Sequence, residues 1–130
     1  MDEQAKKDKQ KDYRLRNTYG ITLEEYNKIL LYQNNCCAIC KKPFDATKKS
    51  FACDHSHTSG LVRGLLDWQC NKALAFFRDD PKRFLAAAEY LTNPPATIAL
   101  GGERITTPGG DSKKRRKLMK KLRDQKCQTK

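Results

Sequence analysis

The sequence has no long run of apolar residues. No stretch approaches the roughly 18 consecutive apolar residues that a membrane-spanning helix needs, and the first residues, Met1–Lys6, lack the apolar core of a secretory signal. Internal repeats are absent as well. These absences predict a soluble, intracellular protein.

Acidic residues are scarce relative to basic ones. The chain has 27 Lys and Arg against 15 Asp and Glu, which gives a net charge of +12 and a pI near 9.6. Such a charge attracts polyanions, so nucleic acid is the first candidate partner. The alternative is a solvated lysine-rich surface that binds no polyanion. At 130 residues, the chain can form one modest domain with tails, but not two full cores.

The sequence contains six cysteines, which are Cys36, Cys37, Cys40, Cys53, Cys70 and Cys127. In a reducing interior they are better interpreted as metal ligands or buried thiols than as a disulfide framework. Zinc takes four ligands in structural sites. Cys36 and Cys53 are spare candidates for a fourth ligand, and Cys127, in a basic tail, is the least suited.

Three other cysteines have the spacing of a zinc knuckle. Cys37 and Cys40 form a Cys-x-x-Cys half-site, and Cys70 follows Asp67 by three positions, so the second half-site holds a carboxylate and a thiolate. A zinc ion there would stabilise a domain whose core is small. In the alternative interpretation, the thiols are small buried hydrophobic groups and Asp67 only caps the next helix.

Local patterns predict an α+β domain. Thr22 and Glu25 have the spacing of a capping box, so a helix begins after Thr22. Two short apolar runs, 51–57 and 61–66, are joined by a turn in which Gly60 supplies a positive φ angle, and they predict a hairpin. The second strand leads into a helix near position 68.

A later helix completes the predicted domain. Asp80 is its N-cap, Pro81 takes its first helical position, and Asn93-Pro94-Pro95 ends it. The sequence thus divides into four parts. Residues 1–18 are a basic lead, helical but without a clear apolar stripe, and residues 19–92 are a compact domain. Residues 93–111 are a linker or wandering strand, and residues 112–130 are a basic tail able to become helical on a phosphate backbone.

The strongest catalytic signal is Asp54-His55, followed by Asn71 at the start of a helix. Two oxygen ligands, from Asp54 and Asn71, suit a Mg²⁺ ion that takes its other ligands from water and a substrate phosphate. His55, with an ordinary pKa near roughly 6.5, could remove a proton from the attacking water.

That interpretation requires an irregular strand. Neighbouring residues of a regular strand point to opposite faces, so Asp54 and His55 serve one phosphate only if the strand bulges or opens. The alternative is that His55 and His57 share a strand face and merely pack or bind zinc. Asn71 alone would be an ordinary helix-start residue.

Several ordered motifs together resemble the phage recombination endonuclease VII family. The resemblance covers about residues 19–91 and rests on Tyr19-Gly20-Ile21-Thr22, Cys37-Ala38-Ile39-Cys40, Asp54-His55-Ser56-His57, Gly60-Leu61-Val62-Arg63-Gly64-Leu65-Leu66 and Cys70-Asn71. That family belongs to the His-Me finger, or ββα-metal, HNH-like nucleases. The resemblance therefore implies a small ββα-metal core with flanking helices and a zinc-stapled knuckle.

The resemblance also implies roles for individual residues. Asp54 and Asn71 would bind the catalytic Mg²⁺, His55 would be the general base, and His57 would make a supporting phosphate or metal contact. Cys37, Cys40 and Cys70 match three of the family's four structural zinc ligands, and Asp67 stands at the fourth position, where the family has Cys. This departure bears on the structural zinc more than on the catalytic chemistry.

The substrate implied by the resemblance is branched DNA, such as a four-way Holliday junction, cut to leave 5′ phosphates in the cytoplasm of a phage-infected bacterium. Two-fold junctions favour a homodimer with two active sites. The basic residues expected to contact DNA phosphates are Arg63, Lys72, Lys113, Lys114, Arg115 and Arg116. The alternatives are an HNH-type nickase acting on duplex DNA, a non-catalytic zinc-knuckle DNA-binding protein, and an assembly factor that binds packaged DNA.

Overall fold

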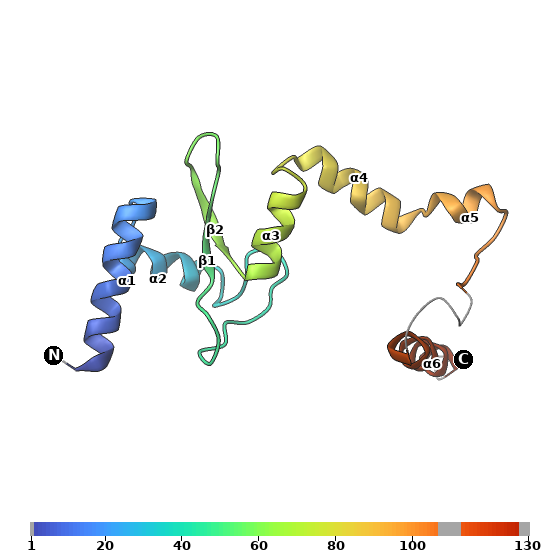
Figure 1. The fold of residues 1–130 in the computed structure, drawn as a ribbon, viewed down its shortest axis with the longest axis horizontal. Helices are drawn as coiled ribbons and strands as arrows, with labels where there is room; N and C mark the ends of the chain where they lie inside the picture. Colours follow the sequence, from blue (N-terminus) through green and yellow to red (C-terminus); the bar gives the residue numbers. More distant parts are fainter. Residues whose placement is uncertain (1, 107–112, 128–130) are drawn as a thin grey trace. The chain divides into compact units, whose positions relative to one another are not determined.

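The computed structural model describes residues 2–106 and 113–127, and within the last helix it describes the side chains of 116–125. The chain forms two compact units, residues 1–85 and 86–130. The elements, labelled in Figure 1, are α1 (Glu3–Tyr19), α2 (Leu23–Tyr32), β1 (Ala52–His55), β2 (Val62–Leu66), α3 (Trp68–Phe76), α4 (Pro81–Thr92), α5 (Pro95–Ala99) and α6 (Lys113–Cys127).

The centre of the first unit is an antiparallel hairpin followed directly by a helix, as Figure 1 shows for β1, β2 and α3. Gly60 has a φ of 76° in the connecting turn, a value that glycine adopts without steric cost. Helix α3 packs against both strands. The predicted hairpin and the helix that follows it are therefore confirmed.

The pairing of the two strands is irregular at one place. Ala52 lies opposite Leu66 and Asp54 lies opposite Gly64, but His55 lies opposite Val62, so the register shifts between Asp54 and His55. Arg63 is left as the extra residue of a β-bulge. A register shift therefore lies at the predicted position, but its additional residue is on β2 and not on the strand that carries Asp54 and His55.

A small core lies between the hairpin and the first two helices. Its buried residues are Leu15, Tyr26, Cys37, Phe51, Cys53, Leu65 and Leu66. The Tyr26 hydroxyl donates a hydrogen bond to the Phe51 carbonyl oxygen at 2.8 Å, which satisfies both buried groups. The Gln33 side chain closes one edge of the core, because its amide donates to the carbonyl oxygens of Cys36 and Leu65 and its oxygen accepts the Leu65 N–H.

The N-terminal segment is an ordered helix within the first unit. Leu15 of α1 is buried, Tyr19 packs against the core, and Asp12 accepts the Leu23 N–H at 2.8 Å. That hydrogen bond lowers the pKa of the Asp12 carboxyl. Two inward side chains near the end of α1 are too few to produce the apolar stripe that a sequence pattern would reveal.

The helix boundaries follow from local caps. Thr22 and Glu25 form the predicted capping box at the start of α2, and the Asp80 carboxylate accepts the Lys82 N–H at the start of α4. Helix α5, which begins at Pro95, lies where the sequence predicted a linker or strand, and a proline at the first position suits a helix start. The predicted domain boundaries remain predictions. No helix in the described part of the chain is long and apolar enough to cross a membrane.

Candidate active site and metal centre

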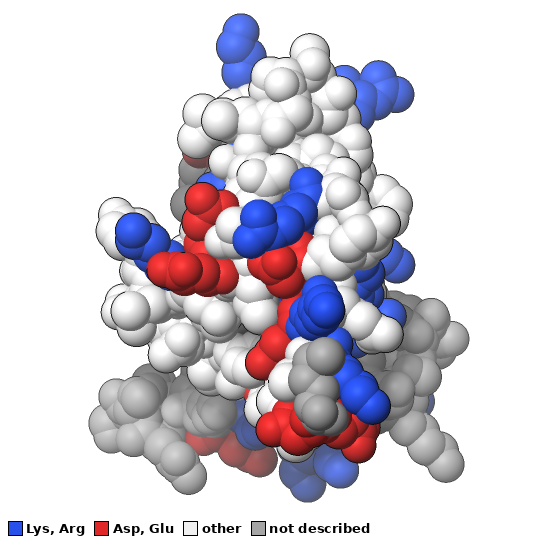
Figure 2. Space-filling model, turned by 90° about the vertical axis from the view of Figure 1, so that its left-hand side faces the viewer, with Lys and Arg blue, Asp and Glu red and all other residues white. Residues whose placement is uncertain are grey.

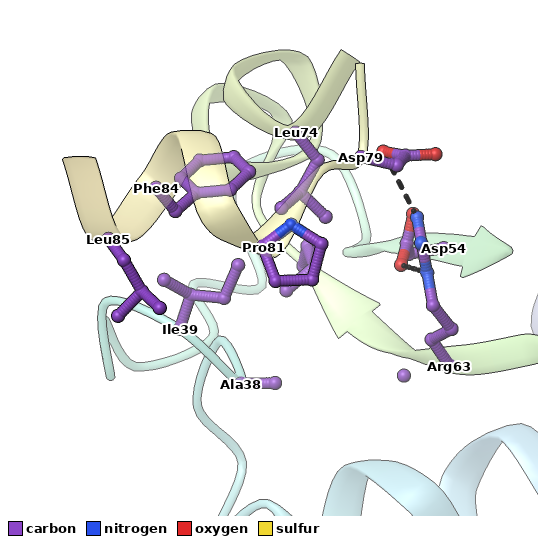
Figure 3. Close-up of a pocket in the computed structure, with 11 residues that line it drawn as sticks. Ala38, Ile39, Asp54, Arg63, Leu74, Asp79, Pro81, Phe84 and Leu85 are labelled. Atoms are coloured by element: carbon purple, nitrogen blue, oxygen red, sulfur yellow. Dashed lines mark hydrogen bonds and ion pairs between the residues drawn. The ribbon is translucent and has the colours of Figure 1, made fainter. Parts of the chain in front are cut away.

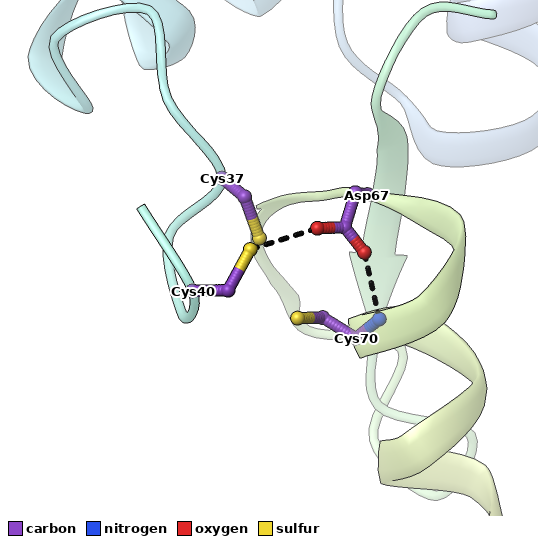
Figure 4. Close-up of side chains that lie close together, drawn as sticks. All are labelled: Cys37, Cys40, Asp67 and Cys70. Atoms are coloured by element: carbon purple, nitrogen blue, oxygen red, sulfur yellow. Dashed lines mark hydrogen bonds between the residues drawn. The ribbon is translucent and has the colours of Figure 1, made fainter. Parts of the chain in front are cut away.

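The predicted zinc ligands converge in the structure. Cys37 and Cys40 lie in the loop after α2, whereas Asp67 and Cys70 lie at the start of α3, and one ligand atom from each residue falls within 4.8 Å of the others. Figure 4 shows the four side chains directed toward a common centre. The Cys40 thiol donates a hydrogen bond to Asp67 Oδ2 at 2.8 Å.

Backbone hydrogen bonds shape the loop that carries the first two cysteines. The Lys41 N–H donates to the Cys37 carbonyl oxygen, and the Cys37 N–H donates to the Lys42 carbonyl oxygen. Lys41 has a φ of 63°, a left-handed conformation that makes the turn tight. The Ala38 N–H donates to the Leu65 carbonyl oxygen at 3.1 Å, so this knuckle is joined directly to β2.

The electrostatics of the cluster favour a cation. Burial and the neighbouring thiols raise the pKa of Cys70 to about 12, and the hydrogen bond to Asp67 raises the pKa of the Cys40 thiol. The same hydrogen bond from Cys40, together with the one from the Cys70 N–H, lowers the pKa of the Asp67 carboxyl. Potential anions are thus crowded together, and a divalent ion at their centre would relieve that repulsion.

The donor set suits zinc better than a hard cation. Three sulfur atoms and one carboxylate oxygen are ligands that zinc accepts in a tetrahedral site, whereas Mg²⁺ and Ca²⁺ prefer oxygen. Cys36 and Cys53 lie outside the cluster: Cys36 donates to the Asn34 carbonyl oxygen and Cys53 is buried in the core. The side chain of Cys127 is outside the described residues.

Asp54 occupies an unusual environment. It is only 7 % exposed and is the one buried charged side chain in the described part of the chain. The Arg63 guanidinium binds its carboxylate through two hydrogen bonds, from Nε to Oδ2 at 2.7 Å and from Nη2 to Oδ1 at 3.0 Å. These hydrogen bonds raise the pKa of Arg63. Each carboxylate oxygen has more than one lone pair, so the pairing with Arg63 still leaves positions at which Asp54 can bind a metal ion.

His55 is the last residue of β1, and its imidazole lies in a short series of rings. The ring centroid of His55 is 5.4 Å from that of Tyr19 on α1 and 4.9 Å from that of His57. His55 is half-buried, whereas His57 is exposed. The general-base candidate is thus supported by α1 on one side and accessible from the hairpin turn on the other.

Asn71 lies in the first turn of α3, the helix that packs against both strands. It is half-buried, and its N–H donates to the Asp67 carbonyl oxygen. Within residues 2–106 and 113–127, no hydrogen bond or ion pair joins the side chains of Asp54, His55 and Asn71. The structure places them on the adjoining elements of one ββα unit without direct bonds between them.

A cavity of about 610 Å³ opens beside Asp54. In Figure 3, apolar side chains that include Ile39, Phe84 and Leu85 occupy one end, and the charged side chains of Asp54, Arg63 and Asp79 occupy the other. The Arg63 Nη2 atom lies 3.4 Å from Asp79 Oδ1. Charged groups are therefore confined to the end of the cavity nearest the bulge.

Basic and acidic side chains are mixed on the face that carries α1. Figure 2 shows lysine and arginine among aspartate and glutamate there, and α1 contains the ion pairs Lys7–Glu3 and Arg16–Asp12. Lys72 lies with its Nζ 5.2 Å from the centroid of the exposed Trp68 ring. Arg116 is exposed on α6, and the side chains of Lys113, Lys114 and Arg115 are outside the described residues.

Three functional neighbours were not predicted from the sequence: the ring of Tyr19 beside His55, the carboxylate of Asp79 beside Arg63, and the pairing of Arg63 with Asp54. Tyr19 belonged to a recognised motif, but nothing in that motif indicated its contact. Asp79 directly precedes the predicted N-cap Asp80, and nothing in that pattern indicated its contact with Arg63. The irregularity expected beside Asp54, together with an arginine on the opposite predicted strand, was the signal that could have identified the Asp54–Arg63 pair.

Two phage proteins are similar to this chain in sequence. The Gene 59 protein of Mycobacterium phage L5 is 45 % identical over 95 residues, which cover 72 % of this chain and 57 % of the relative. The Gene 59 protein of Mycobacterium phage D29 is 44 % identical over 89 residues, which cover 68 % and 53 %. This chain thus matches a little over half the length of these relatives. No solved structure gives a significant match.

The family profile described as recombination endonuclease VII matches residues 12–93. The match includes the end of α1, all four candidate metal ligands of the cysteine cluster, the bulged hairpin and α3. It spans well over half of the chain. The chain belongs to the recombination endonuclease VII family.

Proposed function

We propose that this chain is a Mg²⁺-dependent endodeoxyribonuclease that hydrolyses phosphodiesters of branched DNA, such as four-way junctions, and leaves 5′ phosphates. The observation that carries the proposal is the register shift between Asp54 and His55 within a hairpin that is followed by a helix. A local departure from regular strand geometry would let a metal ligand and a base act at one phosphate. Family membership supports the same reaction class.

The residues present fit a hard cation. Asp54 offers a carboxylate in a largely buried position beside an open cavity, and Asn71 offers an amide oxygen from α3. Both are ligand types that Mg²⁺ accepts, and a protein that supplies few ligands leaves positions for water and a substrate phosphate. When bound, Mg²⁺ would stabilise the charge that develops on the phosphate and on the departing 3′ oxygen.

The chain's own residues would supply the remaining steps. Asp54 and Asn71 would hold the ion at the junction of the hairpin and α3. The His55 imidazole would accept a proton from the attacking water while the water oxygen bonds to phosphorus and the bond from phosphorus to the 3′ oxygen breaks. Tyr19, whose ring contacts that of His55, would limit the movement of the imidazole, and His57 would make a supporting phosphate contact. Together these residues have the roles of a His-Me finger, or ββα-metal, site.

A structural zinc ion would complete the fold. We propose Cys37, Cys40, Asp67 and Cys70 as its ligands, supported by the proximity of their donor atoms. Zinc would connect the loop after α2 to the first turn of α3, which also carries Asn71. The zinc would therefore stabilise the helix on which catalysis depends without taking part in the reaction.

DNA would be held by basic residues of α3 and α6. We propose phosphate contacts for Lys72, which follows Asn71 on α3, and for the α6 cluster of Lys113, Lys114, Arg115 and Arg116. The charge of Arg63, which was also expected to contact DNA, is engaged by Asp54, and its role is considered separately below. A homodimer would provide the two active sites that a two-fold junction requires.

A cleavage assay with three substrates tests this function. The protein should nick a four-way junction faster than a nicked or plain duplex in Mg²⁺, and EDTA should stop the reaction. His55→Ala should lower the rate by roughly 10²-fold or more while DNA binding persists, because general-base catalysis is worth about that much. Asp54→Ala should be comparably damaging, and bound zinc should be measured on the same samples.

The outcomes separate the alternatives. Equal rates on plain duplex and junction would indicate an HNH-type nickase rather than a junction enzyme. DNA binding without cleavage under any divalent cation would indicate a non-catalytic zinc-knuckle protein. If the His55→Ala protein cut as fast as the parent, the assignment of the general base would be wrong.

A further inference from the structure

Arg63 is placed by the β-bulge rather than by regular strand pairing. Its neighbours Val62 and Gly64 lie opposite His55 and Asp54, and Arg63 itself has no partner on β1. In a regular register it would lie opposite His55, with its side chain on the face away from Asp54. The bulge redirects the side chain, so that the guanidinium reaches the Asp54 carboxylate.

The contact between the two residues has the geometry of a fixed pair. The two hydrogen bonds from Nε and Nη2 to the two carboxylate oxygens form a fork that holds the carboxylate plane as well as its position. Nη2 also lies 3.4 Å from the His55 carbonyl oxygen. The orientation of Asp54 is therefore defined before any metal ion binds.

Asp79 contacts the guanidinium at Nη2, the same nitrogen that donates to Asp54 Oδ1. Its Oδ1 atom lies 3.4 Å from Arg63 Nη2, and its N–H donates to the Leu74 carbonyl oxygen at the end of α3. Both Arg78 and Asp79 have left-handed φ values, 56° and 54°, which turn the chain back toward β2. For residues other than glycine, such backbone conformations are uncommon and are kept only when the surrounding structure enforces them.

The charge of this group favours a cation rather than a phosphate. Two carboxylates share one guanidinium, so the three side chains together carry one net negative charge. Asp54 is largely buried, and the Arg63 side chain is 31 % exposed. A guanidinium already bound to two carboxylates has little charge left to neutralise a DNA phosphate, whereas the net negative charge attracts a divalent cation.

We propose that Arg63 and Asp79 form a clamp that positions the Asp54 carboxylate for the metal ion, so that Arg63 is a positioning residue and not a DNA-phosphate contact. The proposal rests on the proposed function, in which Asp54 is a Mg²⁺ ligand. Asp79 acts on Asp54 indirectly, by fixing the position of the Arg63 guanidinium. Groups that orient a metal ligand typically change metal affinity or activity about 10–100-fold when they are removed.

The test uses variants that disturb each side of the clamp. Arg63→Lys keeps the positive charge but loses the fork, and Asp79→Asn removes the anchor while leaving the Arg63–Asp54 pair in place. The matched controls are Arg83→Lys and Asp80→Asn, because Arg83 and Asp80 form an exposed pair at 3.8 Å near the start of α4. Thermal midpoints should be recorded for all four proteins.

Mn²⁺ is the probe for the metal site, and DNA affinity is measured separately in EDTA. We expect Arg63→Lys to weaken Mn²⁺ binding, measured by calorimetry without DNA, by about 10-fold or more, and Asp79→Asn to weaken it in the same direction. The part of the Mn²⁺ binding that disappears in Asp54→Ala is the part that belongs to this site. The Mg²⁺ concentration that gives half-maximal cleavage should rise in parallel, and the salt dependence of DNA binding should stay as in wild type.

The opposite pattern would overturn the assignment. If Arg63→Gln lowered the slope of log affinity against log salt by about one unit while Arg63→Lys and Asp79→Asn left Mn²⁺ affinity at the level of the controls, Arg63 would be a phosphate contact. If Arg63→Lys failed to fold, unchanged Mn²⁺ affinity in Asp79→Asn would still refute the clamp. A wild-type protein that binds Mn²⁺ at Asp54 but cuts no DNA would refute the proposed function and not the clamp.

Discussion

The carboxylate of Asp67 has two separable tasks, and substitutions can measure each of them. Its Oδ1 atom accepts the Cys70 N–H at 2.8 Å and caps α3, whereas its Oδ2 atom accepts the Cys40 thiol at 2.8 Å within the cysteine cluster. Asp67→Asn keeps a good capping residue but removes the anionic ligand. Asp67→Ala removes both functions.

The cap should be measurable without metal. Replacing an Asp cap by Ala costs about 1 kcal/mol, whereas Asn is nearly equivalent to Asp. For a folded unit of 85 residues, 1 kcal/mol corresponds to a change of about 4–8 °C in Tm. In EDTA, Asp67→Ala should therefore melt about 4–8 °C below wild type, and Asp67→Asn should melt close to wild type.

The ligand should be visible only when zinc is present. Free zinc at 100 times its Kd stabilises the folded protein by about 2.7 kcal/mol, which corresponds to roughly 10–20 °C in a unit of this size. A tenfold weaker affinity in Asp67→Asn would remove about 1.4 kcal/mol, or half of that gain. Asp67→Cys should bind zinc more tightly than wild type, because sulfur is the softer ligand.

The assay is differential scanning calorimetry with and without EDTA, together with the zinc content of the purified proteins. Wild type and Asp67→Cys should each contain about one zinc per chain when the site is saturated. A wild-type protein without zinc, whose Tm is the same in zinc and in EDTA, would refute the metal centre. Equal zinc affinities in wild type and Asp67→Asn would refute Asp67 as a ligand while leaving the three cysteines as ligands.

Three further results are expected. Burial raises the pKa of Tyr26 to about 12, so the folded protein keeps a proton that the unfolded chain releases above pH 10. The free energy of unfolding, measured in urea titrations, should therefore fall between pH 10 and 12, and Tyr26→Phe should lack this part of the fall. Leu65→Ala should lower the free energy of unfolding by about 2–5 kcal/mol in urea melts, because Leu65 is fully buried, and a loss under 1 kcal/mol would contradict its place in the core. Lys72→Gln should lower the salt slope of DNA binding by about one unit, measured by fluorescence anisotropy, and an unchanged slope would exclude it as a phosphate contact.

The parts of the fold that depend on local chemistry could be predicted. Thr22 and Glu25 marked the start of α2, Gly60 marked the hairpin turn, and Asp80 marked the start of α4, because caps and turns use few residue types at fixed spacings. The need for an irregular strand at Asp54 was also predictable, since strand geometry forbids neighbouring side chains from sharing a face.

The parts that depend on long-range packing could not be predicted. The apolar contacts of helix α1 with the core come from Leu15 and Tyr19, and the many charged residues of the helix concealed that pattern. The contact of Asp79 with Arg63 joins the end of α3 to β2, and no spacing rule connects two such positions. In the cluster, by contrast, the Cys-x-x-Cys spacing was sufficient to predict which four side chains converge, because the geometry of a tetrahedral site restricts the sequence that surrounds it.

The hydrogen bonds of Leu65 have a consequence for communication between the two proposed metal sites. Its carbonyl oxygen accepts from Ala38, which stands between the knuckle cysteines, and from Gln33, which follows α2. Leu65 is separated from Arg63 by Gly64 alone. Loss of zinc would therefore loosen the strand that orients Asp54. Occupancy of the proposed structural site would then affect the affinity of the proposed catalytic site for its metal ion.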